Sequence, residues 1–187
     1  MATLEELIAD AQTRMDKSVD HARTEFNTVR TGRASAALLD RIEIDYYGTK
    51  TPLKQLATIN VPEPRMLTVQ PFDPSSIRTI EKAIQESDLG LTPSSDGKLV
   101  RLPIPQLTEE RRKELVKVVR QMAEEGRVAV RNVRRDAIKH LEELVKNGDV
   151  GDDEERAAET RVQKLTDEHV AKIDDLLKRK EAEIMEV

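Results

Sequence analysis

Apolar residues recur at three- and four-residue steps at both ends of the chain, whereas the middle follows a different pattern. Between residues 4 and 29 they fall on one face, as an amphipathic helix requires. Thr3 and Glu6 have the spacing of a capping box, in which each side chain accepts a hydrogen bond from the other residue's backbone. The pattern predicts a helix that ends near Thr31-Gly32, where glycine can adopt the left-handed cap. Its stripe is Leu4, Leu7, Ile8, Ala11, Met15, Val19, Ala22, Phe26 and Val29.

Two more amphipathic helices are predicted after residue 107. Thr108 followed by Glu109 and Glu110 favours a helix start, and the apolar series then runs to Asn147-Gly148. The acids of 152–155 are expected to cap a final helix. The buried positions expected in the two helices are Leu115, Val119, Met122, Gly126, Ala129, Val133, Ala137, Leu141 and Leu144, then Ala158, Val162, Leu165, His169, Val170, Ile173, Leu176, Leu177 and Ile184. Amphipathic helices of this kind are not stable alone and should bury their stripes together.

The segment from about residue 35 to residue 105 has strand and turn signals. Residues 42–46 alternate apolar and polar positions before a turn at 47–50, and 56–61, 66–70 and 99–102 are further predicted strands. Asp73-Pro74 predicts the start of one short helix, which carries Ile77, Ile80, Ala83 and Ile84. We therefore expect a small α/β domain of short strands and one helix.

The lengths of the elements predict the domain organisation. The partners of the first helix lie beyond residue 107, so the α/β segment must be inserted into a three-helix bundle. The predicted fold is α+β, with residues 1–30 and 106–187 in the bundle and residues 31–105 in the inserted domain. Two segments cross between them, Arg30-Thr31-Gly32-Arg33 and Pro103-Ile104-Pro105-Gln106. Their glycine and prolines are explained first by caps and turns, and second by a hinge.

Charge is distributed unevenly along this acidic chain. The formal net charge is −5, yet residues 111–135 contain nine Lys or Arg and three Glu. The opposite holds for residues 149–159, where six acids face only Arg156. Such asymmetry indicates an oriented electrostatic surface, although a solvated helix face is the commoner explanation of a charge run.

The basic residues of the longest predicted helix share one side. At about 100° per residue they fall within roughly 60° of one another, on the side predicted to face away from the bundle. Glu124 is the only acid among them, whereas a merely solvated face usually alternates both signs. Arginine suits phosphate contact, and a rigid basic rod suits structured RNA that is read by its shape. The stripe comprises Lys113, Arg120, Arg127, Arg131 and Arg134.

Other functional classes have weaker support. The chain has no cysteine, which excludes disulfides and thiolate metal sites and fits a reducing cytoplasm. No stretch has the length of a membrane span, and the first residues lack the layout of a signal peptide. His21, His140 and His169 are expected at the surface or boundary of three helices, so no metal site is predicted. Without a phosphate-binding glycine loop or nucleophile elbow, neither an enzyme nor a cofactor is expected.

An ordered set of phrases along the chain resembles one family, the bacterial ribosome recycling factors. Each phrase is weak alone, but the ordered set is specific. The phrases are Arg14-Met15-Asp16-Lys17, Arg30-Thr31-Gly32-Arg33-Ala34-Ser35, Tyr46-Tyr47-Gly48-Thr49, Thr51-Pro52-Leu53, Glu81-Lys82-Ala83-Ile84, Ser87-Asp88-Leu89-Gly90-Leu91, Leu107-Thr108-Glu109-Glu110-Arg111-Arg112-Lys113 and the segment 127–136.

The resemblance implies an L-shaped protein similar in outline to transfer RNA, whose inserted domain has three β/α/β layers. Such proteins bind the 70S ribosome after termination and, with elongation factor G and GTP used by that partner, split it into subunits and release mRNA and tRNA. A cytoplasmic monomer without a cofactor is implied. The residues implied to contact large-subunit ribosomal RNA are Arg131 and Arg134 first, then Arg112, Arg127 and Arg135, with Lys113 and Arg120 on the same stripe and Arg30 and Arg33 at the hinge. The competing hypothesis is a helical adaptor or chaperone-like binding protein that is not an enzyme.

Overall fold

The structure, a computed structural model, describes residues 3–186 and contains two compact units. One unit comprises the residues up to Arg30 together with Glu109–Glu186, and the other is Thr31–Thr108. Residues 106–108, which the sequence placed in the bundle, group with the inserted unit. Residues 1, 2 and 187, also assigned to the predicted bundle, lie outside the described range.

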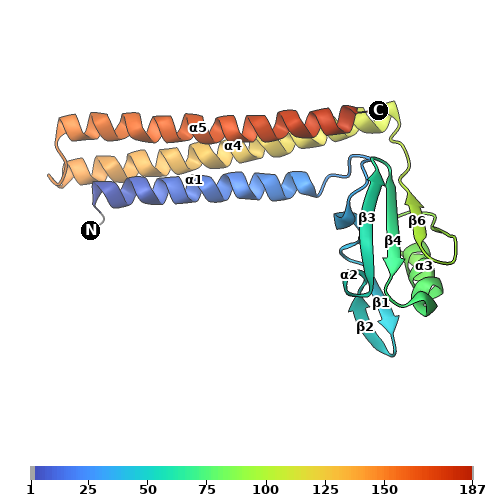
Figure 1. Cartoon of the computed structure of the whole chain (residues 1–187). Helices are drawn as coiled ribbons and strands as arrows, with labels where there is room; N and C mark the ends of the chain where they lie inside the picture. The colour runs from blue at the N-terminus through green and yellow to red at the C-terminus, as the bar shows by residue number, and fades with distance from the viewer. Residues whose placement is uncertain (1–2, 187) are drawn as a thin grey trace. The chain divides into compact units, whose positions relative to one another are not determined.

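The first unit is a bundle of three long helices. α1 (Leu4–Asn27), α4 (Glu109–Lys146) and α5 (Asp152–Met185) lie side by side, with α4 antiparallel to the other two (Figure 1). Their buried faces form one core without large aromatic side chains apart from Phe26. The core residues are Leu7, Ile8, Ala11, Met15, Val19, Ala22, Phe26, Leu115, Val119, Ala123, Gly126, Val130, Val133, Ala137, Leu141, Leu144, Ala158, Val162, Thr166, His169, Ile173 and Ile184.

The two ends of α1 test the predicted capping signals. The capping box is confirmed, since the Thr3 hydroxyl accepts from the Glu6 backbone at 3.2 Å and the Glu6 carboxylate accepts from Thr3 N–H at 2.8 Å. The predicted end near Gly32 is wrong, because the helix already stops at Asn27. There the Thr28 hydroxyl donates to the Glu25 carbonyl at 2.6 Å and closes the last turn locally. Gly32 does have a positive φ of 76°, but it lies beyond the helix.

The buried face of α4 is rotated from the predicted one. Ala123 and Val130 are buried, whereas Met122 and Ala129 are only half-buried. The spacing of apolar residues indicates only that one face of α4 is buried. Because α4 packs against both α1 and α5, its most buried residues are those that face both neighbours. The rotation moves the core toward the arginine side of the helix. In α5, similarly, Thr166 rather than Leu165 is buried.

His169 is buried in the bundle, as its place in the apolar stripe of the last helix predicted, and the other expectation, that of a surface or boundary histidine, is wrong. It is 2% exposed, with Nδ1 2.6 Å from the Leu165 carbonyl oxygen and Nε2 2.6 Å from Asp16 Oδ1 on α1. Since the carbonyl can only accept, Nδ1 carries a hydrogen. The side chain therefore joins α5 to α1 through a polar contact between a buried ring and a half-exposed carboxylate.

Gly126 lies where the three helices pack closely together. A Cβ at this position would lie 3.1 Å from Cδ1 of Ile173 on α5 and 3.3 Å from Cβ of Ala22 on α1. Glycine inside a helix costs about 1 kcal/mol relative to alanine. Its place in the middle of a long helix is explained by this tight packing, since a side chain would require the neighbouring residues to shift.

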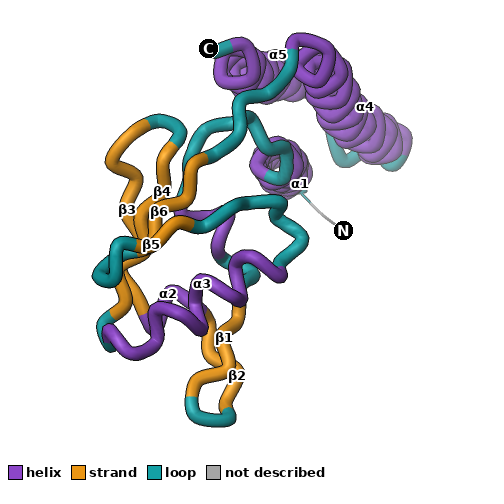
Figure 2. The backbone as a smooth tube through the Cα atoms, turned by 90° about the vertical axis from the view of Figure 1, so that its right-hand side faces the viewer, coloured by secondary structure: helices purple, strands orange, loops and turns teal. Residues whose placement is uncertain are grey.

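The second unit has three layers. The four-stranded antiparallel sheet has the order β3-β4-β6-β5, and β1 and β2 form a separate hairpin. Figure 2 shows α3 between this sheet and the hairpin, and apolar residues of all three layers share one core. The β/α/β arrangement is thus confirmed. The elements are the 3-10 turns η1 (Ala36–Leu39) and η2 (Pro74–Ser76), the strands β1 (Glu43–Tyr46), β2 (Thr49–Pro52), β3 (Ala57–Glu63), β4 (Met66–Pro71), β5 (Ser94–Ser95) and β6 (Val100–Pro103), and the helices α2 (Leu53–Leu56) and α3 (Ile77–Glu86).

The two segments predicted to cross between the domains lie against each other. A Cβ on Gly32 would meet Cγ of Leu107 at 3.3 Å. Two backbone hydrogen bonds to the β3–β4 turn also hold them, from Ala34, which follows the first segment, to the Pro64 carbonyl and from Ile104 of the second segment to the Arg65 carbonyl. These bonds fasten both segments to the sheet of the second unit.

The close packing at Gly126 predicts that a branched side chain there destabilises the bundle. Gly126→Val should lower the free energy of unfolding by about 1–3 kcal/mol through overpacking, although valine is the better helix former. Urea unfolding followed by helical circular dichroism measures this loss. Ala171→Val, at an exposed position of α5, is the control and should cost only the difference in helix propensity, about 0.5 kcal/mol. Unfolding of Gly126→Val at the wild-type urea concentration would contradict the packing account.

Candidate nucleic-acid interface

The arginines of α4 divide into two groups according to their partners. The first group, Arg120 and Arg127, binds carboxylates of α5. Arg120 Nε lies 2.6 Å from Glu181 Oε1, and Arg127 Nε lies 2.8 Å from Asp174 Oδ1. These two ion pairs join α4 to α5. The prediction that the whole stripe faces away from the bundle is wrong for Arg127, which the rotation of α4 brings to its boundary with α5, whereas Arg120 is exposed and pairs with α5 from the surface.

Arg127 is the most enclosed of these arginines. Its side chain is 21% exposed, and Nη1 also lies 2.9 Å from Glu124 Oε2 on its own helix. Burial lowers the pKa of the guanidinium, but the hydrogen bonds to Asp174 and Glu124 outweigh this and raise it. The hydrogen bond to Glu181 likewise raises the pKa of Arg120. Both side chains remain charged, and their charges are matched within the bundle.

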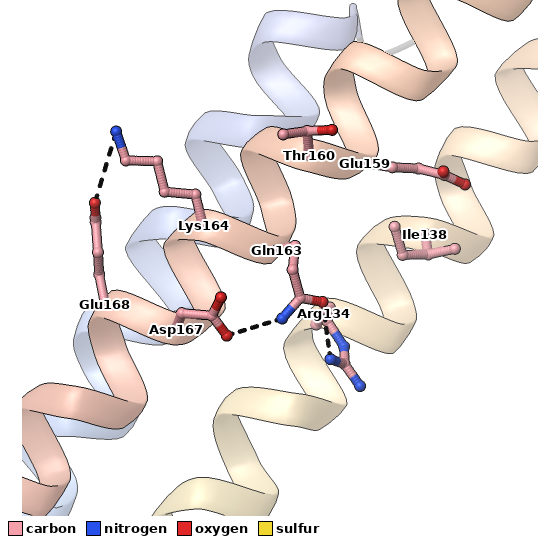
Figure 3. Close-up of a pocket in the computed structure, with 8 residues that line it drawn as sticks. All are labelled: Arg134, Ile138, Glu159, Thr160, Gln163, Lys164, Asp167 and Glu168. Carbon is pink, nitrogen blue, oxygen red and sulfur yellow. Dashed lines mark hydrogen bonds and ion pairs between the residues drawn. The ribbon is translucent and has the colours of Figure 1, made fainter.

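The second group, Arg131, Arg134 and Arg135, keeps most of its positive charge available. Arg134 Nη1 donates to the neutral amide oxygen of Gln163 at 3.0 Å, a contact that neutralises no charge (Figure 3). Arg131 has only a long 3.4 Å contact to Glu124, a carboxylate that it shares with Arg127. We call these three residues the outward arginine cluster. Within residues 3–186, Arg135 is exposed and has no hydrogen bond or ion pair.

The remaining predicted contact residues lie at different places. Lys113 is exposed and pairs with Glu109 at 3.0 Å. Arg112 is half-buried, and its Nε is a buried nitrogen without a hydrogen-bond partner among the described residues. Arg30 is exposed at the end of the bundle's first segment. Lys117, which the sequence analysis did not select, is exposed and has no ion pair within the described chain. Lys117 lies one helical turn from Lys113, and this spacing in the sequence could have identified it.

The groove between α4 and α5 begins beside the outward arginine cluster. Arg134 and Ile138 line it from α4, and Gln163 and Asp167 line it from α5. Figure 3 shows Gln163 between Arg134 and Asp167, with its amide nitrogen donating to the Asp167 carboxylate at 2.9 Å. The amide therefore orients the Arg134 guanidinium without binding it to a carboxylate.

The described residues offer little for metal or membrane chemistry. No group of three or more His, Asp or Glu among residues 3–186 is placed to hold a metal ion. None of the helices in that range is both long and apolar enough to cross a bilayer. The chemistry that the α4 surface offers is a set of fixed cations, which suits phosphate oxygens.

Comparison with known families identifies the chain. The family model described as "Ribosome recycling factor" matches residues 22–185. This chain belongs to the ribosome recycling factor family. Among curated members, the ribosome-recycling factor of Rubrobacter xylanophilus is 56% identical over 180 residues, covering 96% of this chain and 97% of that one. That of Bacillus subtilis is 57% identical over 182 residues, covering 97% and 98%.

Solved structures of the family agree with the fold. A solution structure of the ribosome recycling factor has a TM-score of 0.76 at 44% identity and covers 100% of both chains. A second match has a TM-score of 0.66 at 49% identity and covers 99% of this chain and 100% of that one. It is a model of the T. thermophilus ribosome recycling factor and the E. coli elongation factor G bound to the E. coli post-termination complex.

The two groups of arginines predict different effects on stability. Arg127→Gln should lower the free energy of unfolding by about 1 kcal/mol, because it breaks two ion pairs of a mostly enclosed side chain. Arg135→Gln is the matched control and should stay within about 0.5 kcal/mol of wild type, since it has no partner to lose. Urea unfolding at low salt measures both variants. Equal loss from both would contradict the division into two groups.

Proposed function

We propose that this chain is a translation factor that recycles ribosomes after termination. It binds the post-termination ribosome and, with elongation factor G and GTP hydrolysed by that partner, splits the ribosome into subunits and releases mRNA and tRNA. Membership of the family over nearly the whole chain carries this proposal. The related assembly that holds a family member together with elongation factor G supports the choice of partner.

The bundle docks on large-subunit ribosomal RNA through the outward arginine cluster, Arg131, Arg134 and Arg135. The unmatched charge of these residues supports the assignment, since phosphate groups can complete their hydrogen bonds. Lys113 and Lys117 extend the same face toward the start of α4. Arg120 and Arg127, already bound to carboxylates, hold α4 against α5 and contribute less to RNA affinity. Arg30 and Arg112 add contacts near the crossing segments.

The inserted unit contacts elongation factor G. The crossing segments 30–33 and 103–106 act as a hinge between this unit and the bundle that docks on the RNA. The chain works as a monomer in the cytoplasm and needs no cofactor of its own. It holds no catalytic residue, because the GTP is hydrolysed by its partner. Two observations support this division of roles. The bundle carries fixed cations, and the inserted unit folds separately and is joined to the bundle by two crossing segments.

Subunit splitting tests the proposed function directly. Post-termination 70S ribosomes mixed with this chain, elongation factor G and GTP should dissociate, which light scattering follows in real time. Omission of any one of the three additions, or replacement of GTP by a non-hydrolysable analogue, should leave the ribosomes intact. Intact ribosomes in the complete mixture would contradict the proposal.

Charge reversal within the outward arginine cluster tests the docking surface. Arg131→Glu combined with Arg134→Glu should weaken binding to large subunits about a hundredfold or more, because two charge-assisted contacts are replaced by repulsion. Co-sedimentation measures the loss, and circular dichroism checks that the fold is intact. The control variant, Lys172→Glu with Arg179→Glu, makes the same charge change at exposed positions of α5 and should bind nearly as wild type. Equal weakening by both variants would mean a general charge effect without a defined docking face.

A further inference from the structure

Three of the four aromatic side chains of this protein belong to one end of the inserted unit. Tyr46 and Tyr47 lie at the end of the β1–β2 hairpin, and their ring centroids are 4.5 Å apart in an edge-on arrangement. The Tyr46 hydroxyl lies 3.4 Å from Oδ2 of Asp73, which follows Phe72 after β4. We call Tyr46, Tyr47 and Phe72 the aromatic tip. A chain with only two tyrosines, two phenylalanines and no tryptophan thus places most of its aromatic surface there.

Tyr47 is a costly residue for the position that it occupies. It forms the two-residue hairpin turn with Gly48, and both residues have positive φ, 51° and 81°. Such turns favour Asn, Asp or Gly, because a bulky side chain is strained in this conformation. Among residues 3–186 no other residue except glycine has a positive φ. The strain is not offset by burial, since Tyr47 is 84% exposed.

Phe72 is a second aromatic residue that is mostly exposed. It is 67% exposed although Pro71 before it is buried. Its backbone N–H donates to the Leu56 carbonyl at 3.0 Å, and Asp73 after it is fixed by hydrogen bonds from the Ser75 backbone and hydroxyl. Those same bonds hold the pKa of Asp73 below its usual value. The ring is therefore exposed on a firmly held backbone, which lowers the entropy lost on binding.

The surroundings of the aromatic tip indicate what class of partner it fits. Asp45 adjoins Tyr46 in β1 and Asp73 lies at the Tyr46 hydroxyl, and Lys50 is the register partner of Asp45 across the hairpin. This acidic border repels the phosphates of RNA, which the cations of α4 attract instead. Exposed tyrosine and phenylalanine on a rigid support are typical anchors of protein interfaces, where each ring fills a pocket.

We propose that the aromatic tip is a docking surface for a protein partner, with the rings inserted in an apolar recess that is bordered by Lys or Arg. The inference rests on the proposed function, in which that partner is elongation factor G. The strain at Tyr47 is then explained by binding, because the ring must protrude from the turn to reach the recess.

Tyr47→Asn separates binding from folding, since asparagine suits the turn and lacks the ring. The variant should unfold at the same urea concentration as wild type or a higher one. The elongation factor G concentration needed for half-maximal ribosome splitting should rise about tenfold, the usual consequence of removing an aromatic anchor. Binding to large subunits without elongation factor G should not change. Tyr47→Phe, which keeps the ring, should behave nearly as wild type.

Val61→Ser is the matched control, because Val61 is an exposed apolar residue of β3 in the same unit. It should leave the splitting titration unchanged, and Phe72→Ser should shift it in the same direction as Tyr47→Asn. Identical titrations of wild type and Tyr47→Asn would overturn the proposal for the tip alone. Weakened ribosome binding of Tyr47→Asn without elongation factor G would also overturn it and assign the ring to a ribosomal contact. Failure of the wild-type chain to split ribosomes would overturn both this proposal and the proposed function.

Discussion

The close packing of α4 against α1 and α5 is the constraint on which the rest of the bundle depends. At Gly126 a side chain would require the neighbours to shift, because Ile173 and Ala22 approach from the two neighbouring helices. The tight packing there is consistent with the rotation of α4 that the whole buried face shows. The rotation in turn determines which arginines reach α5 and which remain in contact with solvent. A change in core packing would therefore change the charged surface as well.

The same rotation explains why a run of arginines in an acidic protein has two roles. Arg120 and Arg127 meet Glu181 and Asp174 across the α4–α5 boundary, and so their charges stabilise the bundle. No carboxylate fully neutralises the charges of Arg131, Arg134 and Arg135, and so these side chains are available to an anion. The proposed ribosomal RNA contact uses the unmatched charge and leaves the ion pairs intact. A rigid bundle can then present fixed cations without rearranging on binding.

Local signals predicted much of the fold, and the failures come from long-range packing. The Thr3–Glu6 capping box and the hairpin turn at Tyr47-Gly48 depend on a few adjacent residues, and both are present. The choice of Ala123 and Val130 over Met122 and Ala129 depends on where two other helices lie, which a single helical period cannot show. The polar partner of His169 could not be predicted for the same reason, since Asp16 is on α1. The split within the arginine stripe could not be predicted either, because the carboxylates that divide it belong to α5.

The salt dependence of large-subunit binding tests the division of the arginines most directly. Replacing Arg131, Arg134 and Arg135 by glutamine should lower the slope of log affinity against log salt by about one for each phosphate that is no longer bound. Replacing Arg120 and Arg127 by glutamine should leave the wild-type slope almost unchanged, while the free energy of unfolding falls. Equal reductions of the slope in the two variants would contradict the account, since both groups of arginines would then bind the RNA.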